Sequence, residues 1–482
     1  MRQPTLLLAL IAIAYTGMTV DARCHVTSHC SEDLLLKGTV LTSLGAQRRS
    51  SILLRFGKIE CVNEDCESVA TNATIIDCFN SIISPGFINT HEHIAYSTVE
   101  PLADIGERTN HRHDWRLGLR GFTKRDLPVN GSEINAIKWG ELRHLFSGTT
   151  SIVGGMMTLG LTRNLDFVDG LQDGLTAPAS YWDVFPLDDT DGDLRNGDCD
   201  YGSSPMTRAA ASKFNRYIAH IADGIDAEAE NEFRCISNIT FDTQPAPRGG
   251  GLSTDLVGPN LVIVQGVGLT ENDFDMVAAR GAKVVWSPRS NVFLYGKTLN
   301  VTYLLEAGIT VALGTDWLPS GSATMSREAI CGLSVMRKSY GITLDPKTIW
   351  EMMTINAANV AGFERRIGSL EEGKLADITV VGGRASEFSA YGKSSPFAQA
   401  IFSPPEHIEL VIRAGKILLS TESIKDLVGS CEKLAFGNTT KYACIANELG
   451  SSFRDFETSL GGVYPAILPG VPPREPTCEP TR

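Results

Sequence analysis

The chain has 482 residues, of which 43% are hydrophobic and 21% are charged, and this composition excludes a disordered or fibrous protein. Its length allows one large α/β barrel with an accessory domain. The net charge of −13 comes without a basic cluster, which argues against nucleic acid or an anionic membrane as a partner and leaves small neutral or cationic substrates open.

The first 22 residues have the pattern of a secretory signal peptide. Arg2 precedes an apolar run from Leu6 to Ala14, and the small-residue pattern Val20-Asp-Ala ends before Arg23. The alternative is a buried N-terminal helix, but the run is too short to span a bilayer. We therefore expect a secreted protein, and five sequons are compatible with glycosylation during export: Asn72, Asn130, Asn238, Asn300 and Asn438.

Eleven cysteines agree with an oxidising compartment and leave at least one thiol unpaired. Most lie near the chain ends, where they suggest disulfide bonds. Cys235 and Cys331 lie in apolar central segments and are expected to be buried free cysteines. Neither a second long apolar stretch nor a C-terminal anchor signal is evident, so the sequence predicts no membrane anchor.

Short β-like runs between Leu34 and about Ile83 predict a small sheet. Similar runs begin at Leu375 and His407, and we expect the two chain ends, residues 23–84 and 367–425, to form one β-sandwich. Residues 426–482 are predicted to be an irregular tail that contains cysteines.

Residues 85–366 alternate short Val/Ile-rich runs with helical patterns, which is typical of repeated βαβ units. No glycine-rich dinucleotide fingerprint follows the first strand, and about eight units favour a closed (β/α)8 barrel of the TIM type. The expected strands cover residues 86–90, 150–154, 179–184, 217–222, 261–264, 283–286 and 309–314, with a poorly marked one near 165–168.

Histidines and an aspartate follow three of these strands, at the barrel end where reactive groups gather. His91 and His93 alternate, so both imidazoles face one side, and His220 and Asp316 each close an apolar run. Alone, each has an ordinary alternative: an exposed strand, a core histidine or a helix cap. Together, three nitrogens and a carboxylate suit Zn²⁺ or Fe²⁺ with one position left for water.

Three stretches in this order resemble the metal motifs of the amidohydrolase superfamily: Ser84-Pro-Gly-Phe-Ile-Asn-Thr-His-Glu-His, His220-Ile-Ala-Asp-Gly and Gly314-Thr-Asp-Trp. The resemblance covers about residues 34–420. It is closest to the mononuclear branch that includes cytosine and guanine deaminases and triazine hydrolases, because no strand-four lysine stands out. It implies one divalent metal ion, zinc in preference to iron, held by His91, His93, His220 and Asp316, with Asp316 also accepting a proton from the metal-bound water.

Two positions depart from that family pattern. Asp223 stands where the branch commonly has a proton-shuttling glutamate, and an aspartate can do this chemistry with a shorter reach. Its alternative role is a helix cap. Gln265 replaces a histidine on the sixth strand; it can hydrogen-bond a substrate oxygen or the metal-bound water but cannot exchange a proton near neutral pH.

Loop residues around the barrel mouth are candidates for substrate binding. Arg289 could pair with a substrate carboxylate, although a structural salt bridge is the commoner use of such an arginine. His111, Arg112, His113 and Trp115 could line the pocket or supply an alternative base, or could lie in a solvated surface loop. Loops expected over the metal also contain Asn291, Trp317, Ser320 and the segment Tyr181-Trp-Asp-Val-Phe-Pro.

The sequence thus predicts a secreted, metal-dependent amidohydrolase that hydrolyses a non-peptide C–N bond of a small molecule. Deamination and amide hydrolysis both stay open, as does a homo-oligomeric state. The alternative is a secreted metal-binding or ligand-binding protein that keeps the barrel and has lost catalysis with Gln265.

Overall fold

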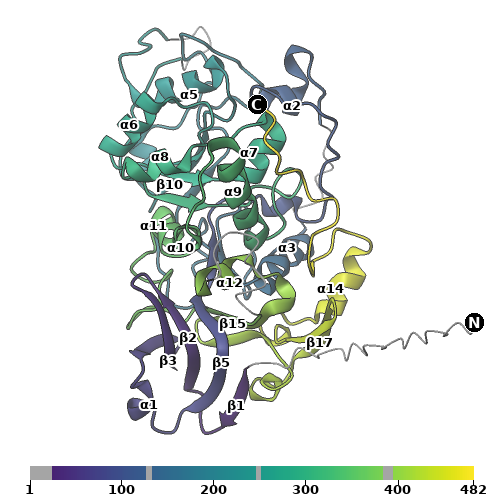
Figure 1. The fold of residues 1–482 in the computed structure, drawn as a ribbon. Helices are drawn as coiled ribbons and strands as arrows, with labels where there is room; N and C mark the ends of the chain where they lie inside the picture. Colours follow the sequence, from purple (N-terminus) through teal and green to yellow (C-terminus); the bar gives the residue numbers. More distant parts are fainter. Residues whose placement is uncertain (1–23, 126–132, 246–250, 384–394) are drawn as a thin grey trace, which may run out of the picture.

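The protein has two parts, a large β-sheet and a barrel of strands and helices, at opposite ends of the ribbon in Figure 1. The computed structural model describes residues 24–125, 133–245, 251–383 and 395–482. The predicted signal peptide, residues 1–22, lies outside the described residues, as does the sequon at Asn130. No helix in the described segments is long and apolar enough to cross a membrane.

Strands from both chain ends meet in one ten-stranded sheet, in the order β17-β18-β16-β15-β14-β5-β2-β3-β4, with β1 paired to β5. The N-terminal strands are β1 (His25–Ser28), β2 (Leu34–Thr42), β3 (Gly45–Arg55), β4 (Lys58–Asn63) and β5 (Thr74–Pro85). The C-terminal strands are β14 (Ile378–Val381), β15 (Ile408–Arg413), β16 (Lys416–Ser420), β17 (Glu432–Phe436) and β18 (Thr439–Ala443). β5 and β14 pair antiparallel, so the two ends share one apolar core that includes Leu36, Ile83, Ile378 and Ile412.

Eight short strands form the barrel, and they fall close to the predicted runs. They are β6 (Phe87–Asn89), β7 (Thr149–Ile152), β8 (Arg163–Asn164), β9 (Tyr181–Asp183), β10 (Tyr217–Ile221), β11 (Leu261–Gln265), β12 (Lys283–Trp286) and β13 (Val311–Leu313). The poorly marked strand lies two residues earlier than predicted, because Val168 is exposed to solvent. Every residue of β10, β11, β12 and β13 is buried, as expected for parallel strands covered on both faces.

The barrel strands pair in two parallel arcs, β6-β7-β8 and β9-β10-β11-β12-β13. Backbone hydrogen bonds join the arcs at both seams. The amide of Asp316 donates to the carbonyl of His91 (2.8 Å), and the amide of Ser180 donates to the carbonyl of Leu165 (3.0 Å). The predicted (β/α)8 fold class is confirmed, and the first seam brings two of the predicted metal ligands side by side.

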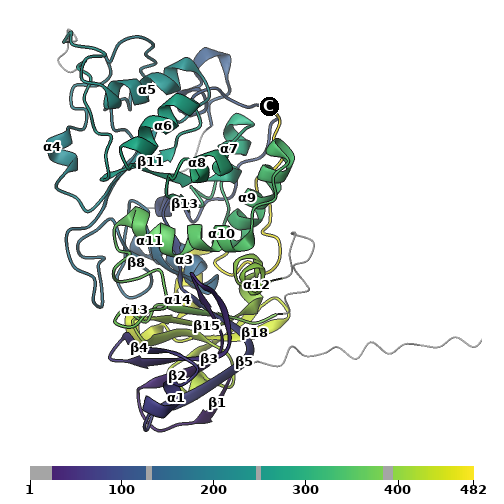
Figure 2. The same ribbon diagram turned by 60° about the vertical axis from the view of Figure 1, so that its left-hand side comes forward.

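Helices cover the barrel after most strands, and Figure 2 shows them around its outer side. They are α2 (Arg112–Leu117), α3 (Ile134–Phe146), α4 (Arg208–Ala211), α5 (Ala227–Ser237), α6 (Glu271–Ala279), α7 (Pro288–Tyr295), α8 (Val301–Glu306), α9 (Met325–Tyr340), α10 (Pro346–Met353) and α11 (Ile355–Ala361). Residues 153–180, which are all described, contain no helix, so β7, β8 and β9 are connected by loops alone.

The irregular tail predicted after Asp426 is wrong in part. In this tail β17 and β18 extend the sheet, α13 (Ala446–Leu449) follows β18, and α14 (Phe453–Leu460) packs on α3. Earlier in the chain, α12 (Pro396–Phe402) packs against β2 and β5. The last segment, residues 463–482, then runs past α9 to the barrel end beside α7 (Figure 1). It is tied there by hydrogen bonds from Thr481 and Arg482 to the carbonyl of Gly296.

Five disulfide bonds link ten of the eleven cysteines: Cys24–Cys78, Cys61–Cys66, Cys199–Cys235, Cys331–Cys478 and Cys431–Cys444. Cys30 is free and exposed. The expectation that Cys235 and Cys331 are free is wrong, because each meets a partner that is 36 or 147 residues away in the sequence.

Candidate metal centre and active site

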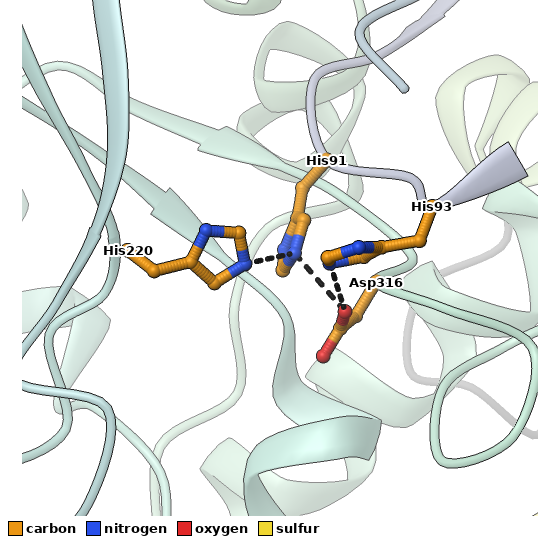
Figure 3. Close-up of side chains that lie close together, drawn as sticks. All are labelled: His91, His93, His220 and Asp316. Atoms are coloured by element: carbon orange, nitrogen blue, oxygen red, sulfur yellow. Dashed lines mark hydrogen bonds and ion pairs between the residues drawn. The ribbon is translucent and has the colours of Figure 1, made fainter. Parts of the chain in front are cut away.

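Four predicted ligands converge at the carboxyl ends of the barrel strands. One ligand atom from each of His91, His93, His220 and Asp316 lies within 4.8 Å of all the others. Asp316 Oδ1 lies 3.0 Å from His91 Nε2 and 3.3 Å from His93 Nε2, and His220 Nε2 lies 3.2 Å from His91 Nε2 (Figure 3). The side chains come from three strands that are far apart in the sequence.

The position of the proton on the His220 ring indicates which kind of ligand this cluster can bind. Its Nδ1 faces the backbone carbonyl of Asp183 (3.1 Å), which can only accept, so Nδ1 carries the proton and Nε2 offers a lone pair to the cluster. Burial lowers the pKa of His220 well below its usual value, so the ring is neutral. The lone pair therefore faces the His91 imidazole in a cluster that also holds a carboxylate, an arrangement that a cation would stabilise.

The spacing of the donor atoms also fits a metal ion. With zinc–nitrogen bonds of about 2.0–2.1 Å, a tetrahedral site has neighbouring donors about 3.3 Å apart. The three contacts drawn as dashed lines in Figure 3 are 3.0–3.3 Å long. The donor types and their separations therefore fit one divalent metal ion.

The backbone has an unusual conformation at the carboxyl ends of the barrel strands, where the metal ligands lie. Ala222, Gln265 and Asp316 all have positive φ angles, of 53°, 74° and 57°, just after β10, at the end of β11 and after β13. Non-glycine residues rarely adopt this region, and such strain gathers at functional sites. Asn89 adds a link across the seam, because its Oδ1 accepts from the amides of both His91 and Thr315.

Gln265 is engaged by protein groups and does not point freely at a substrate. Its Nε2 donates to Asp316 Oδ2 (3.0 Å), and its Oε1 accepts from Asn291 Nδ2. Ser290 Oγ also donates to Asp316 Oδ2 (2.6 Å), while Asp316 Oδ1 accepts from the Trp317 amide. Gln265 therefore helps to hold the Asp316 carboxylate in the orientation that turns Oδ1 towards the imidazoles.

Asp223 lies in the same cavity as a buried acid. Its Oδ1 accepts a hydrogen bond from the Tyr295 hydroxyl (2.7 Å), and burial raises the pKa of Asp223 to about 6. A carboxyl group with such a pKa can take and return a proton near neutral pH. Tyr295 is a site residue that the sequence did not reveal, because it is one of many aromatic residues and its approach to Asp223 depends on the fold.

Trp182 on β9, the fourth barrel strand, belongs to the segment Tyr181-Trp-Asp-Val-Phe-Pro that is predicted to lie over the metal. Its ring centroid lies 5.2, 5.1 and 4.8 Å from those of His91, His93 and His220. The indole thus packs against all three imidazoles on the strand where a bridging lysine would stand. This placement agrees with a single metal ion.

A cavity of about 530 Å³ opens beside the cluster, and the predicted pocket residues that line it are Arg112, Trp115 and Trp317. His113 is fully buried, and its two ring nitrogens face Asp189 (2.8 Å) and Arg116 (2.7 Å). Asn291 contacts Gln265 and Thr298. These two residues lie behind the wall of the cavity, a placement that corrects the prediction that they contact substrate.

Arg289 is also placed differently from the prediction. Its guanidinium donates to Ser322 Oγ and to the carbonyl of Pro476, and it lies 3.3 Å from the Glu475 carboxylate. These partners leave it no role in the cavity lining. The commoner use of a barrel-loop arginine, a structural salt bridge, is therefore the one observed, and its partner comes from the C-terminal segment.

Comparison with known proteins agrees with this architecture. Residues 210–418 match the amidohydrolase family. A 5'-deoxyadenosine deaminase from Methanothermobacter thermautotrophicus is 26% identical over 422 residues, covering 81% of this chain and 93% of that protein. A 5-methylthioadenosine/S-adenosylhomocysteine deaminase from Syntrophobacter fumaroxidans is 33% identical over 169 residues, covering 34% of this chain and 35% of that protein.

Solved structures share the fold at lower identity. An adenosine deaminase from Xanthomonas campestris with bound zinc superimposes with a TM-score of 0.56 at 17% identity, covering 89% of this chain and 98% of that one. The E. coli guanine deaminase superimposes with a TM-score of 0.56 at 15% identity, covering 80% and 99%.

Proposed function

Because the chain belongs to the amidohydrolase superfamily, as its motifs predict, we propose that it is a metal-dependent deaminase that removes an amino group from a heterocyclic small molecule. The broader class, a hydrolase of C–N bonds other than peptide bonds, is confirmed by the relatives. The choice of deamination rests on the two sequence relatives from Methanothermobacter and Syntrophobacter, whose names describe deaminases of adenine-containing compounds.

One observation carries the proposal: a four-donor cluster and a separate buried acid open into the same cavity. His93, His220 and Asp316 line the cavity together with Asp223. A structural metal site is normally closed by protein ligands, whereas a catalytic site keeps a position open to the solvent or substrate. A cavity beside the cluster therefore favours catalysis over a structural ion.

Each residue has a defined task in this proposal. His91, His93, His220 and Asp316 would hold the ion, which supplies Lewis-acid activation of water. Asp223 would carry a proton on its carboxyl group towards the leaving nitrogen, and Tyr295 keeps that group oriented through its hydrogen bond to Oδ1. Gln265 orients Asp316 and does not exchange protons. The proposed chemistry therefore depends on a single proton carrier, Asp223.

Zinc is the proposed ion in preference to iron. Three imidazole nitrogens and one carboxylate are a common zinc donor set. The related adenosine deaminase of Xanthomonas campestris has bound zinc.

We also propose that the mature protein is secreted. The support comes from the signal-like first 22 residues and from the five disulfide bonds, which persist in oxidising compartments.

The test combines metal analysis with ammonia release. Purified protein is assayed for bound transition metals, and then for ammonia release from purine, pyrimidine and nucleoside amines before and after chelation. We expect about one zinc per chain, activity that is lost with the metal, and loss of both in His220→Ala. His29→Ala, at an exposed histidine away from the site, is the matched control.

Two outcomes would contradict the proposal. Protein that contains no stoichiometric metal would remove the basis of the site. Metal-loaded protein that is inactive on every amine, and gains activity only as Gln265→His, would instead support a binding protein on this barrel.

A further inference from the structure

The cavity beside the metal ligands has a strongly cationic wall. Among its lining residues in the described chain, four are basic, and the two acidic ones, Asp223 and Asp316, belong to the catalytic end. The basic residues come from α2 and the segment that follows it: Arg112, Arg116, Lys124 and Arg125. This excess contrasts with the net charge of −13 for the whole chain.

Arg112 is neutralised within the protein. Its guanidinium lies 2.5 Å from the Asp189 carboxylate and 3.0 Å from that of Glu232, and all three side chains are buried. A buried charge normally needs such partners. Arg112 therefore builds the wall and leaves no charge for a ligand.

Arg116 is held by neutral groups. Its Nη1 donates to His113 Nδ1 (2.7 Å) and its Nη2 donates to the carbonyl of Thr190 (3.1 Å), while its guanidinium carbon lies 4.5 Å from the centre of the Phe185 ring. No carboxylate of the described residues forms an ion pair with it. Arg116 is half-buried, so its charge is partly desolvated without being neutralised by a direct partner.

His113 explains how Arg116 keeps its place. Because the guanidinium can only donate, His113 Nδ1 accepts, and the opposite nitrogen therefore carries the proton that it donates to Asp189 (2.8 Å). Asp189 is in turn fixed by Arg112. This chain of contacts orients the guanidinium in advance, which reduces the entropy lost when a ligand binds.

Aromatic rings lie beside the metal ligands in the cavity that Arg116 also lines. The Tyr96 ring lies 6.3 Å from that of His93 and 5.0 Å from that of Trp317, and Trp115 lies 5.0 Å from Trp317, centre to centre. Arg116, Tyr96, Trp317 and Asp223 all line this one cavity. A flat ring that reacts at the metal would thus share the cavity with these aromatic rings and with Arg116.

We propose, on the basis of the deaminase function above, that the substrate is a heteroaromatic amine that also carries an acidic group, a carboxylate or a phosphate, and that Arg116 binds this group. The guanidinium fork matches the two oxygens of such an anion. Lys124 and Arg125 line the same cavity. The cavity volume of about 530 Å³ is within the range for a ligand of drug size, which leaves room for a substituent on the ring.

Matched ligands test this subsite by direct binding. Adenosine, adenosine 5'-carboxylate and adenosine 5'-monophosphate are titrated calorimetrically into metal-loaded and metal-free protein. We expect at least one acid to bind about tenfold or more tightly than adenosine in both forms, and the two acids distinguish a carboxylate site from a phosphate site. In Arg116→Gln we expect this preference to fall about tenfold, with Arg116→Lys between the two.

Arg454→Gln, at an exposed arginine on α14, is the control and should keep the preference of the wild type. Equal binding of acid and neutral ligands, absence of binding by all three, or a preference that survives in Arg116→Gln would each overturn the subsite. Ammonia release separates the two proposals: an active enzyme without Arg116-dependent acid preference refutes the subsite alone, whereas Arg116-dependent binding without any metal-dependent hydrolysis refutes the function alone.

Discussion

At the residue scale, the main departure from the family pattern has a structural explanation. Gln265 replaces a histidine, and its amide joins Asn291 to Asp316, so the carboxylate receives hydrogen bonds from Gln265, Ser290 and the Trp317 amide. With these donors in place, Asp316 is well suited to stay ionised as a ligand. It is a weaker proton acceptor for the same reason. In the proposed reaction, proton transfer therefore falls to Asp223.

Replacement of Asp223 by asparagine tests this assignment. In Asp223→Asn we expect kcat/KM for the best amine substrate to fall about 10²–10⁴-fold, because the side chain can no longer carry a proton. The bound metal, measured by elemental analysis, should stay at the wild-type level, since Asp223 is outside the four-donor cluster. Asp169→Asn, in an exposed loop, is the control, and full activity in Asp223→Asn would contradict the role.

A second buried acid links stability to pH. Glu328 on α9 accepts from the Arg289 amide (2.9 Å), and burial raises the pKa of Glu328 from 4.5 to about 7. Folding thus favours the protonated form. This contribution is complete below about pH 4.5 and is lost as the pH rises through about 7, with a total of at most about 3 kcal/mol.

Glu328→Gln mimics the protonated acid and should flatten that part of the pH profile. The measurement is the free energy of unfolding in urea at several pH values between 4.5 and 8, for wild type and variant. We expect the difference between them to change in favour of the variant as the pH rises. Glu306→Gln, at an exposed acid on α8, should reproduce the wild-type slope, and an equal slope in Glu328→Gln would refute the assignment.

At the scale of elements, the C-terminal segment, residues 463–482, links helices α7 and α9 of the barrel; we call this link the C-terminal clamp. Glu475 bridges Arg289 and Arg327, and Cys478 is bonded to Cys331 on α9. Arg289 lies on α7, the helix that also carries Ser290 and Asn291. The last residues of the chain therefore support the helix that orients Asp316, although they lie outside the predicted barrel.

Removal of the Cys331–Cys478 bond measures the strength of this clamp. The bond joins residues 147 positions apart, and loss of such a cross-link typically costs about 2–5 kcal/mol. We expect the free energy of unfolding of the double variant Cys331→Ser, Cys478→Ser to be lower than that of the wild type by this amount. The measurement is the unfolding transition in denaturant. Cys30→Ser removes the free exposed thiol and should leave the unfolding free energy unchanged; an equally stable double variant would show that the clamp is dispensable.

At the scale of the whole molecule, net charge is a poor guide to the site. The chain carries −13 overall, which on its own favours neutral or cationic ligands. The cavity nevertheless gathers Arg116, Lys124 and Arg125 on one wall. Local fields in a cleft depend on which charges the fold brings together, and the sum over the surface does not report them.

The proposed secretion should leave a selective glycosylation pattern. Asn72, Asn238 and Asn438 are exposed, whereas the Asn300 side chain caps α8 by accepting from the Tyr303 amide. We expect peptide mapping of protein from a eukaryotic secretory host to find glycans at the three exposed sites and none at Asn300. Unmodified protein in the culture medium would contradict the glycosylation, and retention of the chain in the cytosol would contradict secretion.

The sequence by itself determined the barrel strands and the four metal donors. Each depends on a local pattern, such as the alternation of His91 and His93 or the buried run that His220 and Asp316 close, and parallel strands bring their carboxyl ends together whatever the loops do. The tertiary structure alone decided the other contacts: Tyr295 beside Asp223, Trp182 against the imidazoles and Arg289 with Glu475. The residues of each pair are far apart in the sequence. No local pattern in the chain predicts which distant side chains come into contact when the barrel closes and the C-terminal segment packs on it.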